Sequence, residues 1–75
     1  MSQTPAVTGK RLVMLLESQG WYVKRIRGGH HILRHPNVPD ALPVPIHGNQ
    51  PIKKGTLGNI LRSAGISREE FNRML

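Results

Sequence analysis

The sequence contains no cysteine, four acidic residues, and one residue each of Trp, Tyr and Phe among its 75 residues. Without cysteine the chain can form neither disulfide bonds nor a thiolate metal site, so packing alone must stabilise it. No apolar run approaches the ~18 residues of a membrane span, and the first residues lack the basic start and apolar stretch of a signal peptide. We therefore expect a cytoplasmic protein, and the length limits it to one domain.

The scarcity of acids leaves a strongly basic chain. Eleven Lys and Arg against four Asp and Glu give a formal net charge of +7. Between Gly20 and Gly65 the only acid is Asp40. The same span contains the cations Lys24, Arg25, Arg27, Arg34, Lys53, Lys54 and Arg62. Mixed charges would keep a small domain equally soluble, so this imbalance indicates a polyanionic partner, either a nucleic acid or an acidic protein.

Local patterns in the first half of the chain predict one helix and a β-hairpin. Thr8 is a typical N-cap, and the leucines that follow it have helical spacing up to Gly20. Residues 21–27 are rich in the aromatic and β-branched residues that favour strands, residues 30–36 follow, and the pair Gly28-Gly29 separates the two segments. A glycine pair readily takes the positive φ values of a two-residue turn, so we expect a tight hairpin at this point.

The second half predicts an edge strand and two helices. Residues 42–47 alternate apolar residues with two prolines, which remove donors from one edge of the strand. The apolar spacing over 56–65 is helical, and Ser67 with Glu70 forms the S-x-x-E capping box of a short third helix. The sequence therefore predicts an α+β fold of order α-β-β-β-α, in which the helices cover one face of a three-stranded antiparallel sheet. Residues 1–7 are expected to form a flexible tail and residues 8–75 a single domain.

Residues 25–36, RIRGGHHILRHP, combine three arginines with three histidines and contain no carboxylate. If the two glycines alone form the loop, one sheet face carries Arg25, Arg27, His30, Ile32 and Arg34. The other face would carry Tyr22, Lys24, Ile26, His31, Leu33 and His35. A shift of one residue would exchange these neighbours, so the sequence leaves open which face of the sheet His31 occupies.

The histidines have three interpretations. A metal site is disfavoured, because His30 and His31 point to opposite faces and His31 and His35 would lie roughly 13 Å apart. A partly buried, hydrogen-bonded structural role is the simplest interpretation of His30 and His35. The third is a ribonuclease: RNA carries its own nucleophile, so a histidine beside arginines supplies the proton transfer and phosphate contacts it needs. No paired carboxylates are present to hold Mg²⁺.

Three motifs in this order, the GGHH hairpin, the PIHG loop and the segment KKGTLGNILRSAGIS, resemble the HicA family of bacterial type II toxin–antitoxin systems. The resemblance extends over nearly all of 9–75. It implies a fold like that of double-stranded-RNA-binding domains, an mRNA interferase activity, and inhibition by a HicB antitoxin. It also implies that His31 is the catalytic histidine, while Gly29 stands where serine is usual in the family.

The resulting hypothesis is a metal-independent endoribonuclease toxin without a cofactor. His31 would act as general acid or base when a ribose 2′-hydroxyl attacks the adjacent phosphate of mRNA. His47 is the candidate for a second proton-transfer group, although a histidine on an edge strand is often only solvated. The expected RNA-binding residues are Arg25, Arg27, Arg34, Lys53 and Lys54. The alternative function is a non-catalytic RNA-binding module, which is common for such folds.

Overall fold

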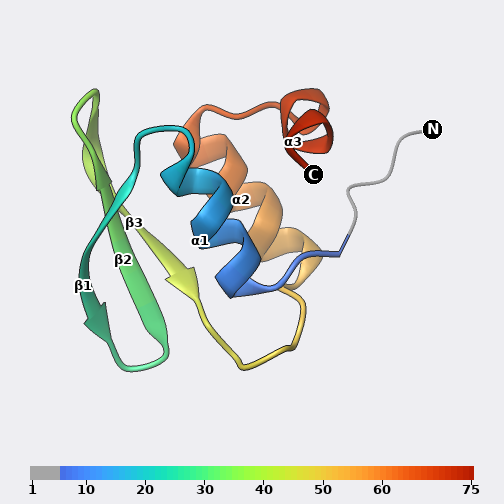
Figure 1. Ribbon diagram of the computed structural model, residues 1–75, viewed down its shortest axis with the longest axis horizontal. Helices are drawn as coiled ribbons and strands as arrows, with labels where there is room; N and C mark the ends of the chain where they lie inside the picture. Colours follow the sequence, from blue (N-terminus) through green and yellow to red (C-terminus); the bar gives the residue numbers. More distant parts are fainter. Residues whose placement is uncertain (1–5) are drawn as a thin grey trace.

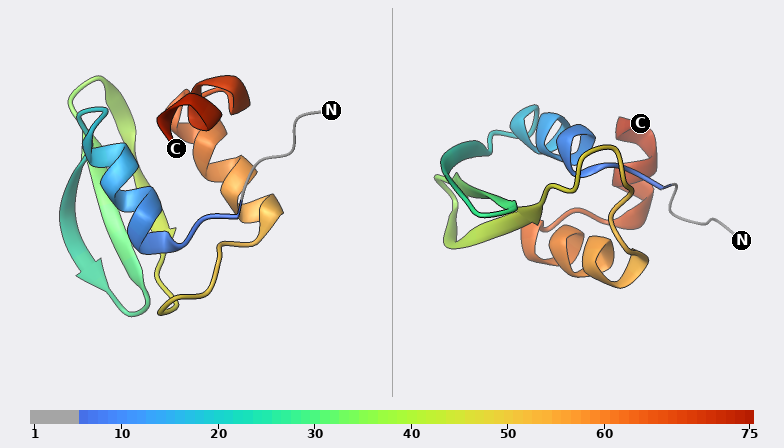
Figure 2. Two further views of the ribbon diagram at one scale, coloured as in Figure 1. Left: turned by 45° about the vertical axis from the view of Figure 1, so that its right-hand side comes forward. Right: turned by 90° about the horizontal axis from the view of Figure 1, so that it is seen from below.

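The computed structural model describes residues 6–75, which form two layers (Figure 1). One layer is an antiparallel sheet of strand order β1-β2-β3, and two helices, α1 and α2, cover the same face of it (Figure 2). The elements are α1 (Gly9–Glu17), β1 (Tyr22–Arg27), β2 (His30–His35), β3 (Val38–Pro45), α2 (Lys54–Ala64) and α3 (Arg68–Met74). This order confirms the predicted α+β fold with its additional C-terminal helix.

Two of the three predicted helix starts are confirmed by their hydrogen bonds. The second helix, α2, begins at Lys54 rather than at residue 56 and has no side-chain cap. The Thr8 hydroxyl caps α1 by accepting a hydrogen bond from the backbone N–H of Arg11 at 3.2 Å. At the start of α3, the Ser67 hydroxyl accepts from the N–H of Glu70 at 3.1 Å, and the Glu70 carboxylate accepts from the N–H of Ser67 at 3.2 Å. These bonds satisfy backbone donors that the first turn of a helix would otherwise leave unpaired.

The hairpin has the predicted two-residue turn. Arg27 pairs with His30 across the strands, so Gly28 and Gly29 alone form the loop. We expected positive φ at both glycines, but only Gly28 has it, at 57°. A positive φ at the first central residue alone is the pattern of a type II′ turn, which matches the twist of the flanking strands. The backbone therefore requires glycine at only one of the two positions.

The third strand lies at the sheet edge, as predicted, but it is longer than expected. It begins at Val38, which pairs with His35, rather than at residue 42. The additional residues include Pro39 and Asp40, which are depleted in strands, so local propensity did not indicate them. An edge position tolerates a proline, because one side of the strand needs no donors.

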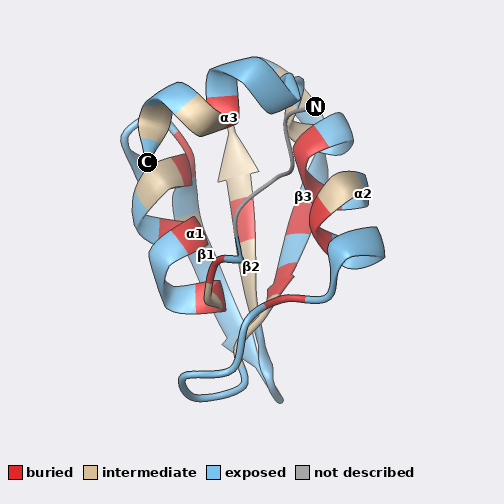
Figure 3. Ribbon diagram, turned by 90° about the vertical axis from the view of Figure 1, so that its right-hand side faces the viewer, coloured by how far each residue is buried: buried red, intermediate tan, exposed pale blue. Residues whose placement is uncertain are grey.

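The core lies between the sheet and the helices (Figure 3). Its buried residues are Val7, Leu12, Val13, Leu16, Trp21, Leu33, Leu42, Val44, Ile52, Leu57, Ile60, Leu61 and Phe71. Val7 was expected in the flexible tail but is only 5% exposed, and its carbonyl accepts a hydrogen bond from the N–H of Ile52 at 2.8 Å. The folded part therefore includes Val7, and residues 1–5 of the expected tail lie outside the described residues.

Candidate functional site

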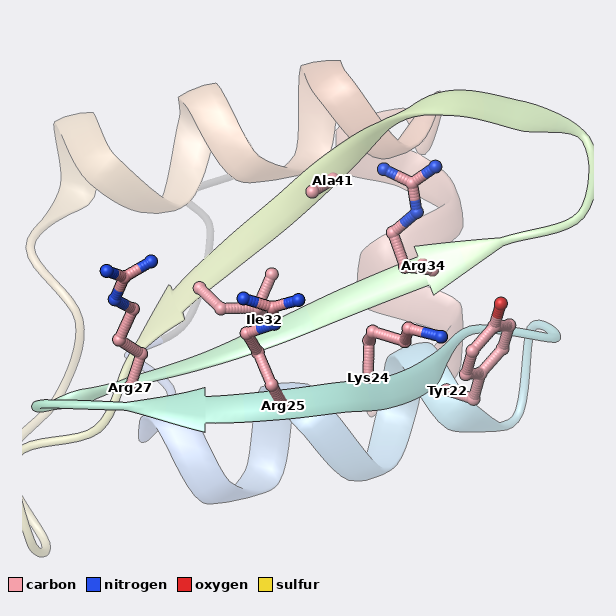
Figure 4. Close-up of a pocket in the computed structure, with 7 residues that line it drawn as sticks. All are labelled: Tyr22, Lys24, Arg25, Arg27, Ile32, Arg34 and Ala41. Atoms are coloured by element: carbon pink, nitrogen blue, oxygen red, sulfur yellow. The ribbon is translucent and has the colours of Figure 1, made fainter.

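A β-bulge in β1 decides which side chains share a face of the sheet. The pairing with β2 shifts between Val23 and Arg25, so Lys24 is an extra residue in β1. An extra residue reverses the alternation of side chains on the N-terminal side of the bulge. The simple alternation placed Tyr22 and Lys24 on the face of His31, and this was wrong: both lie on the same face as Arg25 (Figure 4).

The sheet face turned away from the helices forms a shallow groove of about 510 Å³ (Figure 4). We call it the open-face groove, and it is lined by Tyr22, Lys24, Arg25, Arg27, Ile32, Arg34 and Ala41. Four of these residues are cationic and none is acidic. The structure thus brings the three predicted arginines together and adds Lys24 and Tyr22. Sequence reasoning missed these two as site residues because a bulge leaves no clear trace in residue alternation.

His31 lies on the opposite, helix-facing side of β2, at the boundary between core and solvent. Its cross-strand neighbours are Ile26, which is 67% exposed, and Val44, which is fully buried. His31 itself is half-buried between them. Its Nδ1 atom is buried and has no hydrogen-bond partner among the described residues. Solvent or a ligand must therefore reach the imidazole through its other ring atoms.

His47 lies beside the hairpin turn. The N–H of Ile46 donates a hydrogen bond to the carbonyl of Gly29 at 2.7 Å, which ties the segment after β3 to the turn. A β carbon at Gly29 would lie 3.9 Å from Cε1 of His47. The third strand therefore ends near the hairpin, which was the condition for His47 to act with His31. The His47 side chain is exposed.

The starts of α1 and α2 lie at the same end of the molecule as the hairpin turn (Figure 1). Gly9 packs directly against the carbonyl of Pro45, where a side chain would collide. Lys53 is the N-cap residue of α2 and Lys54 its first residue, and both side chains are exposed. We call the group Gly28, Gly29, His31, His47, Lys53 and Lys54 the hairpin end. The predicted phosphate binders are thus divided between two surfaces: the arginines line the open-face groove, and the lysines belong to the hairpin end.

His35 has the structural role that the sequence suggested. Its Nδ1 accepts a hydrogen bond from the backbone N–H of Asn37 at 3.0 Å, so Nε2 carries the proton and donates to the carbonyl of Gln19, also at 3.0 Å. The ring also lies 5.2 Å from that of Trp21. Both nitrogens are used to join the end of α1 to the turn between β2 and β3. His30, by contrast, is exposed beside the hairpin turn.

The fold and its surfaces define a small, basic α+β protein with a histidine-bearing hairpin end and a separate cationic groove. The family model described as HicA toxin of bacterial toxin-antitoxin matches residues 9–66, so the chain belongs to this family. Membership makes it the toxin of a toxin–antitoxin system and implies a cognate antitoxin as partner. None of the curated proteins matches the chain significantly.

Two further properties of the described residues concern metal ligands and membrane-spanning helices. Within residues 6–75, no three His, Asp or Glu side chains come together in a group that could hold a metal ion. None of the helices formed by these residues has the length and apolar character needed to cross a bilayer.

Proposed function

We propose that the protein is a cytoplasmic mRNA interferase, a metal-independent endoribonuclease whose catalytic site is the hairpin end and whose inhibitor is a HicB-type antitoxin. Family membership supports the toxin role. The observation that carries the nuclease proposal is the environment of His31, whose ring is half-exposed while its Nδ1 is buried and unpaired.

An unpaired buried nitrogen is unfavourable, because the atom has lost water without gaining a partner, at a cost of about 1–3 kcal/mol. A histidine that only stabilised the fold would be bonded as His35 is, through both nitrogens. A catalytic role is one of the recognised explanations for an unsatisfied buried polar group in a native structure. This contrast supports His31 as the proton-transfer residue.

The proposed reaction is transfer of a phosphate ester within the RNA chain. The 2′-oxygen forms a bond to the adjacent phosphorus while the bond from phosphorus to the 5′-oxygen breaks, which leaves a 2′,3′-cyclic phosphate and a 5′-hydroxyl. One group accepts the proton of the 2′-hydroxyl and another donates a proton to the 5′-oxygen, and we assign these steps to His31 and His47. Lys53 and Lys54 are exposed at the start of α2, and we assign to them the stabilisation of the charge that develops on the phosphate.

The test is incubation of a labelled single-stranded RNA with the purified toxin in EDTA, followed by denaturing electrophoresis. We expect shorter fragments that end in a cyclic phosphate. Intact RNA on the denaturing gel, together with a mobility shift on a native gel, would instead support the alternative of a non-catalytic RNA-binding module.

The antitoxin is proposed to cover His31 and the cations around it with an acidic surface. Opposite charges accelerate encounter, so the association rate should rise as ionic strength falls. Stopped-flow mixing at several salt concentrations measures this dependence. An antitoxin that left His31 accessible and RNA cleavage unchanged would contradict inhibition by occlusion.

A further inference from the structure

The open-face groove cannot act on the same phosphate as His31. Ile32 lies in the groove, and His31, the residue before it in β2, lies on the other face of the sheet. The cations of the groove and the imidazole are therefore separated by the sheet itself. If the hairpin end is the catalytic site, the groove needs a separate explanation.

The charge of the groove indicates a polyanion. Lys24, Arg25 and Arg27 are exposed and Arg34 is half-buried. None of the side-chain hydrogen bonds among residues 6–75 involves these four cations. Like charges gathered on one small face repel one another and destabilise the folded state. A chain of phosphates would relieve this repulsion, and the release of its counterions would favour binding.

The shape and the remaining residues favour a single strand over a duplex. Tyr22 is 49% exposed at one end of the groove, and Ile32 and Ala41 add apolar surface to its middle (Figure 4). An exposed aromatic ring can stack on an unpaired base, whereas the bases of a duplex already stack on one another. Tyr22 and Arg27 are the two ends of β1, about 15 Å apart, so the groove can follow several nucleotides.

We infer that the open-face groove binds a single-stranded segment of the RNA substrate that flanks the cut. This inference rests on the proposed nuclease function and adds a binding surface to it. Arg27 borders the hairpin turn, where the strand can pass from the groove to the hairpin end. The turn leaves room for it, because nothing lies within 4 Å of a β carbon placed at Gly28.

The first test measures RNA affinity in the His31→Gln background, where cleavage does not interfere. The probe is a fluorescein-labelled single-stranded RNA of about 15 nucleotides. A groove variant, Lys24→Gln with Arg25→Gln and Arg34→Gln, is compared with a control that loses three exposed cations elsewhere, Arg11→Gln with Arg68→Gln and Arg73→Gln. We expect the groove variant to bind about tenfold more weakly and its salt slope to fall by about 2, while the control changes less than about twofold.

The second test concerns the aromatic ring. Tyr22→Leu should weaken binding of the same RNA by about 5- to 100-fold, whereas Tyr22→Phe keeps the stacking surface and should bind as the parent does. A blunt duplex of the same sequence should not distinguish the two variants. Thermal melting by circular dichroism verifies that each variant is folded.

The outcomes separate this inference from the proposed nuclease. Equal RNA affinity of the groove and control variants would overturn the inference. If the groove variant also lost affinity for the antitoxin, the groove would be a protein-binding surface. If the wild-type protein leaves RNA intact but binds it through the groove, the nuclease proposal is overturned and RNA binding by the groove is supported. With an active nuclease we expect the groove variant to raise KM for single-stranded RNA and to leave kcat nearly unchanged.

Discussion

The two ends of β2 carry the same side chain in opposite environments. His31 and His35 both lie on the helix-facing side of the strand, with the fully buried Leu33 between them. At the His35 end, both ring nitrogens are hydrogen-bonded and Trp21 lies beside the ring. At the His31 end, Nδ1 is buried without a partner and the neighbour Ile26 is mostly exposed.

Position on the sheet, rather than residue type, therefore decides whether a histidine of β2 is hydrogen-bonded through both ring nitrogens. His35 joins Gln19, just after α1, to Asn37 in the turn that follows β2, so removing its ring would break two hydrogen bonds that the fold uses. His31 makes no such link, because none of the side-chain hydrogen bonds among residues 6–75 involves its ring.

The largest effect is expected from His31→Gln, which retains a hydrogen-bonding side chain but removes proton transfer. The cleavage rate of single-stranded RNA should fall by about 10²- to 10⁴-fold. The melting temperature should stay within a few degrees of the wild type, because the side chain forms no hydrogen bond that folding depends on. A folded His31→Gln protein that cuts RNA at the wild-type rate would remove His31 from the mechanism and leave His30 and His47 to be tested.

His47→Gln tests the proposal that His47 is the second proton-transfer group. We expect a loss of about 10²-fold in cleavage rate, again with unchanged melting. Gln50→Ala, at an exposed position in the same loop, is the matched control and should cleave normally. If His47→Gln and this control cleaved equally well, another group would have to protonate the leaving oxygen.

His35→Ala should show the opposite pattern. It removes two hydrogen bonds and the contact with Trp21, which should lower the free energy of unfolding by about 1–3 kcal/mol. For a domain of this size the melting temperature should then fall by roughly 4–8 °C per kcal/mol, as measured by circular dichroism. RNA cleavage well below that temperature should be retained. A variant that melted normally but lost cleavage would reverse the assigned roles of the two histidines.

The smallest effect separates the two glycines of the hairpin turn. Gly28→Ala places a side chain at a positive φ and should cost about 1 kcal/mol of stability. Gly29 has no such φ, and a β carbon there would meet only ordinary contacts, so Gly29→Ala should be nearly neutral. Chemical denaturation of both variants measures the difference. Equal losses would mean that the turn differs from type II′.

Local chemistry allowed much of this protein to be predicted. The caps at Thr8 and Ser67, the turn after Arg27 and the α-β-β-β-α order all depend on residues close together in the chain, so the sequence alone indicated them correctly. The hairpin and loop motifs also pointed to the family that the match over residues 9–66 confirms. The role of His31 remains a prediction from that resemblance.

The features that the sequence pattern did not indicate depend on contacts between distant segments. The bulge at Lys24 arises where β1 pairs with β2, and it turns Tyr22 toward the arginines, which residue alternation did not predict. The helices cover one face of the sheet, and this packing placed His31 beside the core and the arginines on the open face. Alternation along a strand shows which side chains share a face, but only the packing of other elements decides which face meets solvent.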